Sequence, residues 1–209
     1  MPELAIVALI TFFVTVGPID VAVIFAILAR NQPAAQRRAM ARRGTLLAAA
    51  ILLFFALFGE AFLAVLGITL PALYIAGGIL LLLIGIDMVF ARSSGGVSTT
   101  DAETREAADR ADLAVFPLAT PLLAGPGAIS AAILLMSKAS GDWLAQGIVL
   151  GALLVVMLLT FLCLRLATHI QRFLGVTGSH VLTRILGVLL CALAMQFILD
   201  GLAESGLLG

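Results

Sequence analysis

Two Gly-Pro pairs interrupt long apolar segments of this sequence, each at a point where a helix would otherwise continue. Gly17-Pro18 lies past the middle of one apolar segment, and Gly125-Pro126 lies at the middle of another. Proline lacks an amide donor and suits the first position of a helix, so each pair predicts a helix that ends and restarts. The restarted helix presents unpaired N–H groups, which attract anions. The two pairs therefore predict a binding site for a small solute that carries an anionic group.

Polar side chains flank both pairs and complete this predicted substrate pathway. Asp20 is the most informative, because a carboxylate within an apolar segment is costly and normally faces the protein interior or water. It has two compatible interpretations: an anion that satisfies exposed amides of the restarted helix, or a group that binds a proton or an ammonium group. The predicted pathway residues are Thr15, Gly17, Pro18, Asp20, Thr120, Gly125, Pro126, Gly127 and Ser130.

A simpler interpretation makes the Gly-Pro pairs packing kinks, which neighbouring helices and Thr or Ser hydroxyls would stabilise. Four further polar residues within apolar segments are candidates for a gating or packing role: Glu60, Asp87, Gln196 and Asp200. Small residues also predict close helix packing, at Gly77-Gly78 and at the GxxxG pattern of residues 147–151.

The elements that carry these residues must be membrane-spanning helices. Of the 209 residues, 62% are apolar and 11% are charged, and the mean hydropathy is +1.19. Soluble domains have roughly 45–50% apolar and about 25% charged residues, and about 20 apolar residues cross a bilayer. We therefore predict an all-α membrane protein with six transmembrane helices in a single membrane domain, residues 1–209. The predicted spans are residues 4–28, 44–66, 72–91, 113–136, 143–166 and 181–202.

Basic residues set the predicted orientation, because loops rich in Arg and Lys stay on the cytoplasmic side. Residues 30–43, the polar linker 92–112 and the connection 165–184 carry eleven of the twelve cations, and Lys138 lies in a connection on the opposite face. Both termini are then predicted outside, and 92–112 becomes a cytoplasmic linker. The formal net charge is zero, which gives no general attraction to nucleic acid, so no nucleic-acid partner is expected.

The two halves of the chain match each other at a nearly constant offset. Three helices in each half reverse the second half relative to the membrane, as in transporters with inverted repeats. We therefore predict repeat one over residues 1–91 and repeat two over 113–209, with the first and fourth helices broken at Gly-Pro. The matches are Gly17-Pro18 with Gly125-Pro126 and residues 66–69 with 174–177 at an offset of 108, and Gly78 and Asp87 with Gly187 and Gln196 at 109.

Sequence motifs typical of hydrolases and nucleotide-driven pumps are absent. No HExxH, GxSxG, GxxxxGK or CxxC string occurs, so we expect neither an enzyme nor a bound cofactor or metal. Cys163 and Cys191 lie within apolar segments, where a free cysteine behaves as a small hydrophobe. His169 and His180 are interpreted as solvated residues of the fifth connection.

The string Pro-Leu-Ala-Thr-Pro-Leu-Leu-Ala-Gly-Pro-Gly-Ala-Ile at residues 117–129 resembles the fourth-helix signature of the MarC family. Residues 57–61, 76–88 and 196–202 also look like that family. The resemblance implies a multi-pass protein of the bacterial inner membrane, related to LysE-like exporters of small solutes. Many members have an Asn-Pro-x-Gly-Asn pattern where this chain has Gly-Pro-Ile-Asp-Val at 17–21, so the polar groups differ here.

These observations lead to one main functional hypothesis and two alternatives. The main hypothesis is a secondary transporter or exporter of small neutral or zwitterionic solutes such as amino acids, with a proton or sodium as the candidate coupling ion. Membrane lipid and the solute are then its partners. One alternative is a passive channel, which could use the same half-helices as a filter. The other is a membrane protein that takes part in assembly or lipid handling without transporting solutes.

Overall fold

The fold is known from a computed structural model, which describes residues 2–29, 32–90 and 114–206. The predicted cytoplasmic linker 92–112 lies outside the described residues. The described chain is helical throughout apart from short connections, and no strand occurs in it. Its elements are α1 (Pro2–Val16), α2 (Pro18–Leu28), α3 (Ala34–Val65), α4 (Leu70–Phe90), the π-helix η1 (Ala114–Leu123), α6 (Pro126–Lys138), α7 (Trp143–Arg165) and α8 (Ala167–Glu204).

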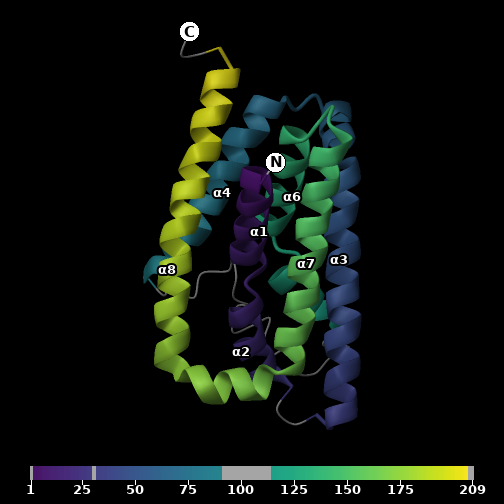
Figure 1. Ribbon diagram of the computed structural model, residues 1–209, viewed down its shortest axis with the longest axis vertical. Coiled ribbons are helices and arrows are strands. Elements are labelled where there is room, and N and C mark those ends of the chain that lie inside the picture. Colours follow the sequence, from purple (N-terminus) through teal and green to yellow (C-terminus); the bar gives the residue numbers. More distant parts are fainter. Residues whose placement is uncertain (1, 30–31, 91–113, 207–209) are drawn as a thin grey trace.

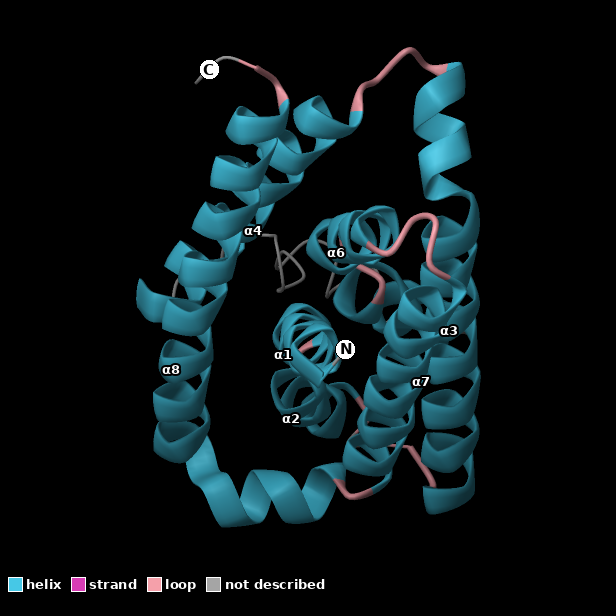
Figure 2. Ribbon diagram, turned by 45° about the horizontal axis from the view of Figure 1, so that its top comes forward, coloured by secondary structure: helices cyan, strands magenta, loops and turns pink. Residues whose placement is uncertain are grey.

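The helices α1, α2 and α6 lie in the centre, and α3, α4, α7 and α8 surround them (Figure 2). Around this centre, α1 packs against α7, α3 packs against both η1 and α6, and α4 packs along α8. Most residues of α6 are buried, including a continuous run from Gly127 to Ser137 with one half-buried position, Ile129. The polar residues Thr15 of α1 and Ser130 of α6 are buried in this centre.

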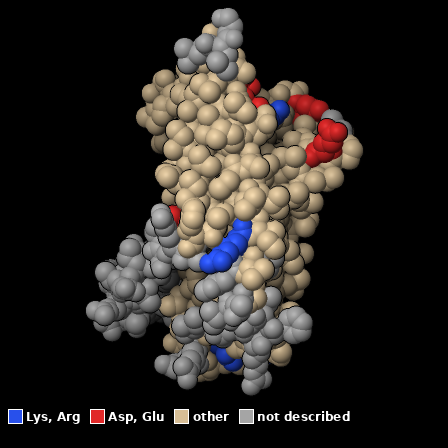
Figure 3. Space-filling model, turned by 90° about the vertical axis from the view of Figure 1, so that its left-hand side faces the viewer, with Lys and Arg blue, Asp and Glu red and all other residues tan. Residues whose placement is uncertain are grey.

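Five helical segments are long and apolar enough to cross a membrane: residues 2–26, 34–65, 70–90, 143–165 and 183–204. The shorter apolar helix α6 adds to η1 to make the fourth predicted segment. Large apolar side chains such as Phe54, Phe62 and Leu158 are more than half exposed, as expected of a surface that contacts lipid. Figure 3 shows a broad uncharged surface over the upper half of the α8 side, with acidic side chains gathered at its upper edge and a basic side chain below it, near the middle.

Two helices are longer than their apolar segments. Helix α3 begins at Ala34, ten residues before the predicted span, because the intervening Ala, Gln, Arg and Met residues favour helix. The fifth connection is also helical: α8 starts at Ala167, so His169 and His180 lie in a helix and their predicted place in a loop is wrong. Figure 1 shows α8 crossing the lower end of the molecule before it turns upward beside α4.

Glycines bring α4 and α8 into backbone contact. A Cβ atom at Gly78 would lie 2.8 Å from the Ala194 carbonyl oxygen, and one at Gly187 would lie 3.0 Å from the Gly85 carbonyl oxygen. The predicted close packing at Gly78 is therefore confirmed. The GxxxG pattern of α7 behaves differently, because a Cβ at Gly147 or Gly151 would meet no atom of the described residues within 4 Å. Its interpretation as a packing face within the chain is wrong.

Candidate functional site

Gly17 joins α1 to α2 and belongs to the caps of both helices. Its φ of 60° is left-handed, and its N–H donates to the Phe13 carbonyl at 3.1 Å, which is the αL motif that ends a helix. Its own carbonyl accepts from the Val21 N–H at 2.9 Å and so begins α2, with Pro18 at the first helical position. Only glycine adopts this conformation without strain. Gly17 and Pro18 are both buried, away from lipid.

The junction at Gly125 has a different geometry. Gly125 is extended, with φ of −78° and ψ of 169°, and caps α6, which has Pro126 in its first turn. The preceding η1 is a π-helix, in which the Ala124 N–H donates to the Ala119 carbonyl five residues back at 2.9 Å. Prolines at positions 117 and 121 lack amide donors, which disfavours a regular α-helix there. Gly125 and Gly127 are buried, whereas Pro126 is exposed.

Asp20 lies in the first turn of α2 and accepts a hydrogen bond from a residue on α8. The Thr183 hydroxyl donates to Asp20 Oδ1 at 2.6 Å, and both side chains are partly buried. Thr183 lies 163 positions further along the chain, so no local sequence signal could have identified it. The carboxylate is thus positioned between a helix N-terminus, which stabilises negative charge, and a hydroxyl from the opposite half of the molecule.

Thr15 and Thr120, two other predicted polar residues, form hydrogen bonds within their own helices. The Thr15 hydroxyl donates to the Thr11 carbonyl at 2.8 Å, and the Thr120 hydroxyl donates to the Val115 carbonyl at 3.4 Å. Ser130 is buried against α4, where a Cβ at Gly77 would lie 3.5 Å from Ser130 Cβ. Neither bond joins two of the polar residues in the predicted pathway, which are Thr15, Asp20, Thr120 and Ser130. What the fold does bring together is the interrupted helices themselves, since α1 packs against α6 and α2 against η1.

A charged cluster lies where α6 ends. Lys138 forms an ion pair with Asp200 of α8, and their side chains are 37% and 22% exposed. The Gln196 amide donates to the other carboxylate oxygen of Asp200 at 2.7 Å. The Lys138 ammonium also lies 5.4 Å from the centre of the Phe197 ring and 6.0 Å from that of Tyr74. These contacts tie the end of α6 to α8.

The remaining candidates for gating or packing lie on separate helices. Glu60 is exposed on α3, and Asp87 is half-buried near the end of α4. In the sequence, Lys138 was used only to predict the orientation in the membrane. In the structure it forms an ion pair with Asp200, one of the candidates for a gating or packing role. The pairing depends on how α6 and α8 pack, so the spacing of the two residues carried no signal for it.

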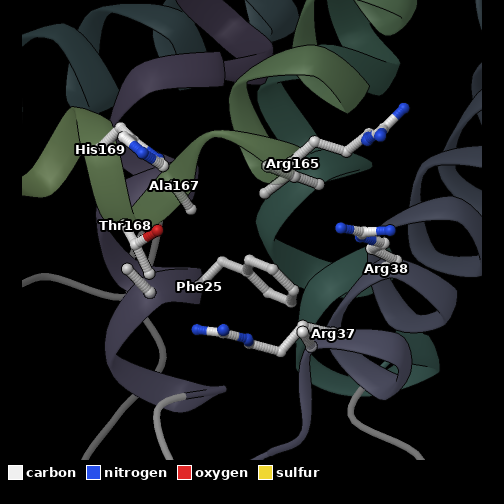
Figure 4. Close-up of a pocket in the computed structure, with 10 residues that line it drawn as sticks. Phe25, Arg37, Arg38, Arg165, Ala167, Thr168 and His169 are labelled. Atoms are coloured by element: carbon white, nitrogen blue, oxygen red, sulfur yellow. The ribbon is translucent and has the colours of Figure 1, made fainter.

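A basic cavity of about 190 Å³ lies at the opposite end of the molecule, where α3 begins and α7 ends. Arg37 and Arg38 of α3, Phe25 of α2, and Arg165 and His169 on either side of the α7–α8 junction line it, among others (Figure 4). The sequence indicated only that these arginines share one face of the membrane. Figure 4 shows the side chains of Arg38 and Arg165 extending toward the same side of the cavity.

Comparison with known proteins finds relatives over nearly the whole chain. Residues 3–205 match the model of the MarC family integral membrane proteins. The UPF0056 membrane protein MJ1677 of Methanocaldococcus jannaschii is 39% identical over 199 residues, covering 94% of this chain and 95% of the relative. UPF0056 membrane protein YvbG of Bacillus subtilis is 34% identical, with 92% and 91% covered, and YhcE of Escherichia coli is 34% identical, with 92% and 89% covered. No solved structure matches the chain. By the extent of these matches, the chain belongs to the MarC family of multi-pass integral membrane proteins.

Proposed function

We propose that this chain is a secondary transporter, rather than an enzyme, and that it exports small neutral or zwitterionic solutes such as amino acids. The observation that carries the proposal is the central position of the two interrupted helices, α1–α2 and η1–α6, inside a ring of continuous helices (Figure 2). Transporters with inverted repeats bind their substrates at discontinuous helices of this kind, near the middle of the membrane.

The packing of the helices supports the inverted repeat that this mechanism needs. Exchanging α1–α2 with η1–α6, α3 with α7, and α4 with α8 turns each principal helix pair into another that is also packed. The contact of α1 with α7 becomes that of η1 with α3, and the contact of α2 with α8 becomes that of α6 with α4.

Individual residues on α4 and α8 follow the same exchange. Under the 109-residue offset seen in the sequence, Gly85 corresponds to Ala194 and Gly78 to Gly187. The close approach of Gly78 to Ala194 then has a counterpart in the approach of Gly187 to Gly85, and both approaches occur. A repeat deduced from spacing alone would not require this agreement, so it strengthens the proposal.

The interrupted helices suggest how a zwitterion would bind. From the middle of the molecule α2 runs toward the arginine-rich end and α6 runs toward the Lys138 end (Figure 1). Their N-termini therefore both lie near the middle, where their amides favour a carboxylate. Asp20 would receive the ammonium group of the solute, or the proton or sodium ion that drives transport. The buried residues Thr15, Gly127 and Ser130 would line the pathway.

We further propose that the chain lies in the cytoplasmic membrane with both termini outside. The charge distribution supports this, because Arg37, Arg38, Arg42 and Arg165 gather at one end of the bundle, and basic ends stay inside. A reporter that is active only in the periplasm, fused after Gly209, is expected to be active. The same reporter inserted between Arg38 and Ala39 serves as the control and is expected to be inactive. Reversal of the two activities would contradict the orientation.

Counterflow in proteoliposomes tests the transport proposal. Vesicles loaded with unlabelled small amino acids are expected to accumulate external labelled alanine, glycine or serine transiently, because a carrier exchanges solutes across the membrane one for one. Empty vesicles and protein-free vesicles are the controls. A passive channel would give flux without counterflow, and a protein without transport activity would give neither, so either result from correctly inserted protein would contradict the proposal.

A further inference from the structure

Neighbouring hollows that share lining residues follow one another along α3 and α7, starting at the arginine-rich end. Beside the basic cavity of Figure 4 lies a hollow of about 380 Å³, which shares Arg38 and Arg165 with it. A third hollow, of about 360 Å³, shares Arg42 and Phe161 with the second. The second and third hollows together form what we call the α3–α7 groove. It is basic at one end and apolar along the rest.

The spacing of residues along the two helices explains this division. Arg38, Arg42, Leu46 and Ala49 follow one another on one face of α3 at intervals of three or four residues, and Leu154, Leu158, Phe161 and Arg165 do the same on α7. Helix α3 begins at the end where α7 finishes (Figure 1). The arginines of both helices therefore lie at one level, and their apolar side chains lie together above them.

The groove has the dimensions of one acyl layer. From Arg165 back to Leu154 the helix rises about 16 Å, at 1.5 Å per residue, which is about half of the ~30 Å hydrocarbon core. Phe161 lies at the boundary between its two parts, with the Arg165 guanidinium carbon 5.8 Å from the ring centre. Leu46, Leu154 and Leu158 are at least half exposed, so a chain in the groove would cover apolar surface.

The charges at the basic end match an anionic group. Among the described residues that line the groove, none is Asp or Glu. Within the part of the chain that the structure describes, no salt bridge to a carboxylate engages Arg38, Arg42 or Arg165. Arginine binds phosphate through parallel N–H donors. A soluble phosphate would leave the apolar hollow unfilled, and a neutral lipid would leave the arginines without an anion.

We infer that the α3–α7 groove binds an anionic glycerophospholipid, with the headgroup phosphate on Arg38, Arg42 and Arg165 and one acyl chain between Ala49 and Leu158. Basic pockets between transmembrane helices at the cytoplasmic face bind anionic headgroups in this way. The inference is independent of the proposed transport function, because it uses the periphery of the bundle and none of the predicted pathway residues.

Fluorescence quenching by brominated lipids tests the inference. The chain has one tryptophan, Trp143, so W143F combined with L158W has its only reporter in the groove. The matched control is W143F with L159W, a neighbouring exposed position outside the groove. The lipid preference is the ratio of the binding constants obtained from quenching by brominated phosphatidylglycerol and by brominated phosphatidylcholine, in phosphatidylcholine vesicles. We expect this ratio to be about five or more at L158W, since one basic residue contributes about that factor. At L159W we expect almost no preference.

Charge and shape variants separate the two parts of the groove. Adding R42Q and R165Q to the L158W reporter is expected to abolish its preference for phosphatidylglycerol. The control pair R43Q and R184Q removes two arginines outside the groove and is expected to leave the preference unchanged. Filling the apolar hollow with A49F is expected to abolish the lipid preference. The neighbouring variant A50F lies outside the hollow and is expected to leave the preference unchanged. If L158W destabilises the protein, L154W reports from the same groove.

Two outcomes would overturn the inference. The first is an equal lipid preference at L158W and L159W. The second is displacement of phosphatidylglycerol by excess glycerol 3-phosphate with no effect of A49F, because the arginines would then bind a soluble phosphate and not a lipid.

Discussion

The double variant G78A/G187A is expected to lose most of its folded population on mild heating. Each new methyl group meets backbone atoms: the Ala194 carbonyl at 2.8 Å for Gly78, and the Gly85 carbonyl and Val89 nitrogen at 3.0 Å for Gly187. Overpacking of this kind costs about 1–3 kcal/mol at each site, which exceeds the roughly 0.5–1 kcal/mol that alanine adds to helix stability. Because native stabilities are only about 5–15 kcal/mol, the combined loss is large.

The matched control is G147A/G151A, which adds the same two methyl groups to a transmembrane helix. A Cβ atom there meets nothing within 4 Å in the described part of the chain, so only the gain in helix propensity remains and a neutral or slightly higher thermal midpoint is expected. The measurement is the midpoint of thermal unfolding in detergent, followed by size-exclusion chromatography. Equal midpoints for the two double variants would refute the close packing of α4 on α8. Unequal decreases of the thermal midpoint in the single variants G78A and G187A would count against the inverted repeat.

The variant D20N is expected to raise the solute concentration for half-maximal counterflow by roughly 10- to 100-fold. Asparagine keeps an oxygen that accepts from the Thr183 hydroxyl, now 2.6 Å from Asp20 Oδ1, but removes the negative charge. A hydrogen bond to a charged group contributes about 1.5–3 kcal/mol, which corresponds to that range for an ammonium group or coupling cation. This prediction depends on the proposed transport function.

Two further variants identify the cause of such a loss. D87N neutralises another half-buried carboxylate in a span, and it is expected to leave counterflow close to normal. T183V removes the hydroxyl but keeps the charge of Asp20, so we expect it to raise the solute concentration for half-maximal counterflow less than D20N does. Full counterflow by D20N would assign Asp20 to the capping of α2 alone. Loss of folded D20N, measured by its thermal midpoint, would also indicate a structural role.

Local signals in the sequence were sufficient for much of the fold. The membrane-spanning segments followed from apolar length, and their ends agree with the helices to within a few residues except at the starts of α3 and α8. Those two exceptions have one cause. Hydropathy finds only the apolar part of a helix, whereas residues 34–43 are polar but favour helix equally well.

The glycines show what local sequence signals could not predict. Gly78 and the GxxxG pattern at Gly147 and Gly151 look alike in sequence, yet α8 covers Gly78 and no part of the described chain covers Gly147 or Gly151. Small residues permit close approach, but they do not specify which helix approaches. Only the arrangement of the bundle distinguishes them.

The sequence by itself determined that this is a helical membrane protein and where most of its helices lie, because apolar length acts locally. The tertiary structure alone decided that Asp20 meets Thr183, that Lys138 meets Asp200, and that arginines from α3 and α7 share one groove. The physical reason is that lipid and protein interior are both apolar. A transmembrane helix is therefore apolar on every face, and its sequence does not mark the face that turns inward.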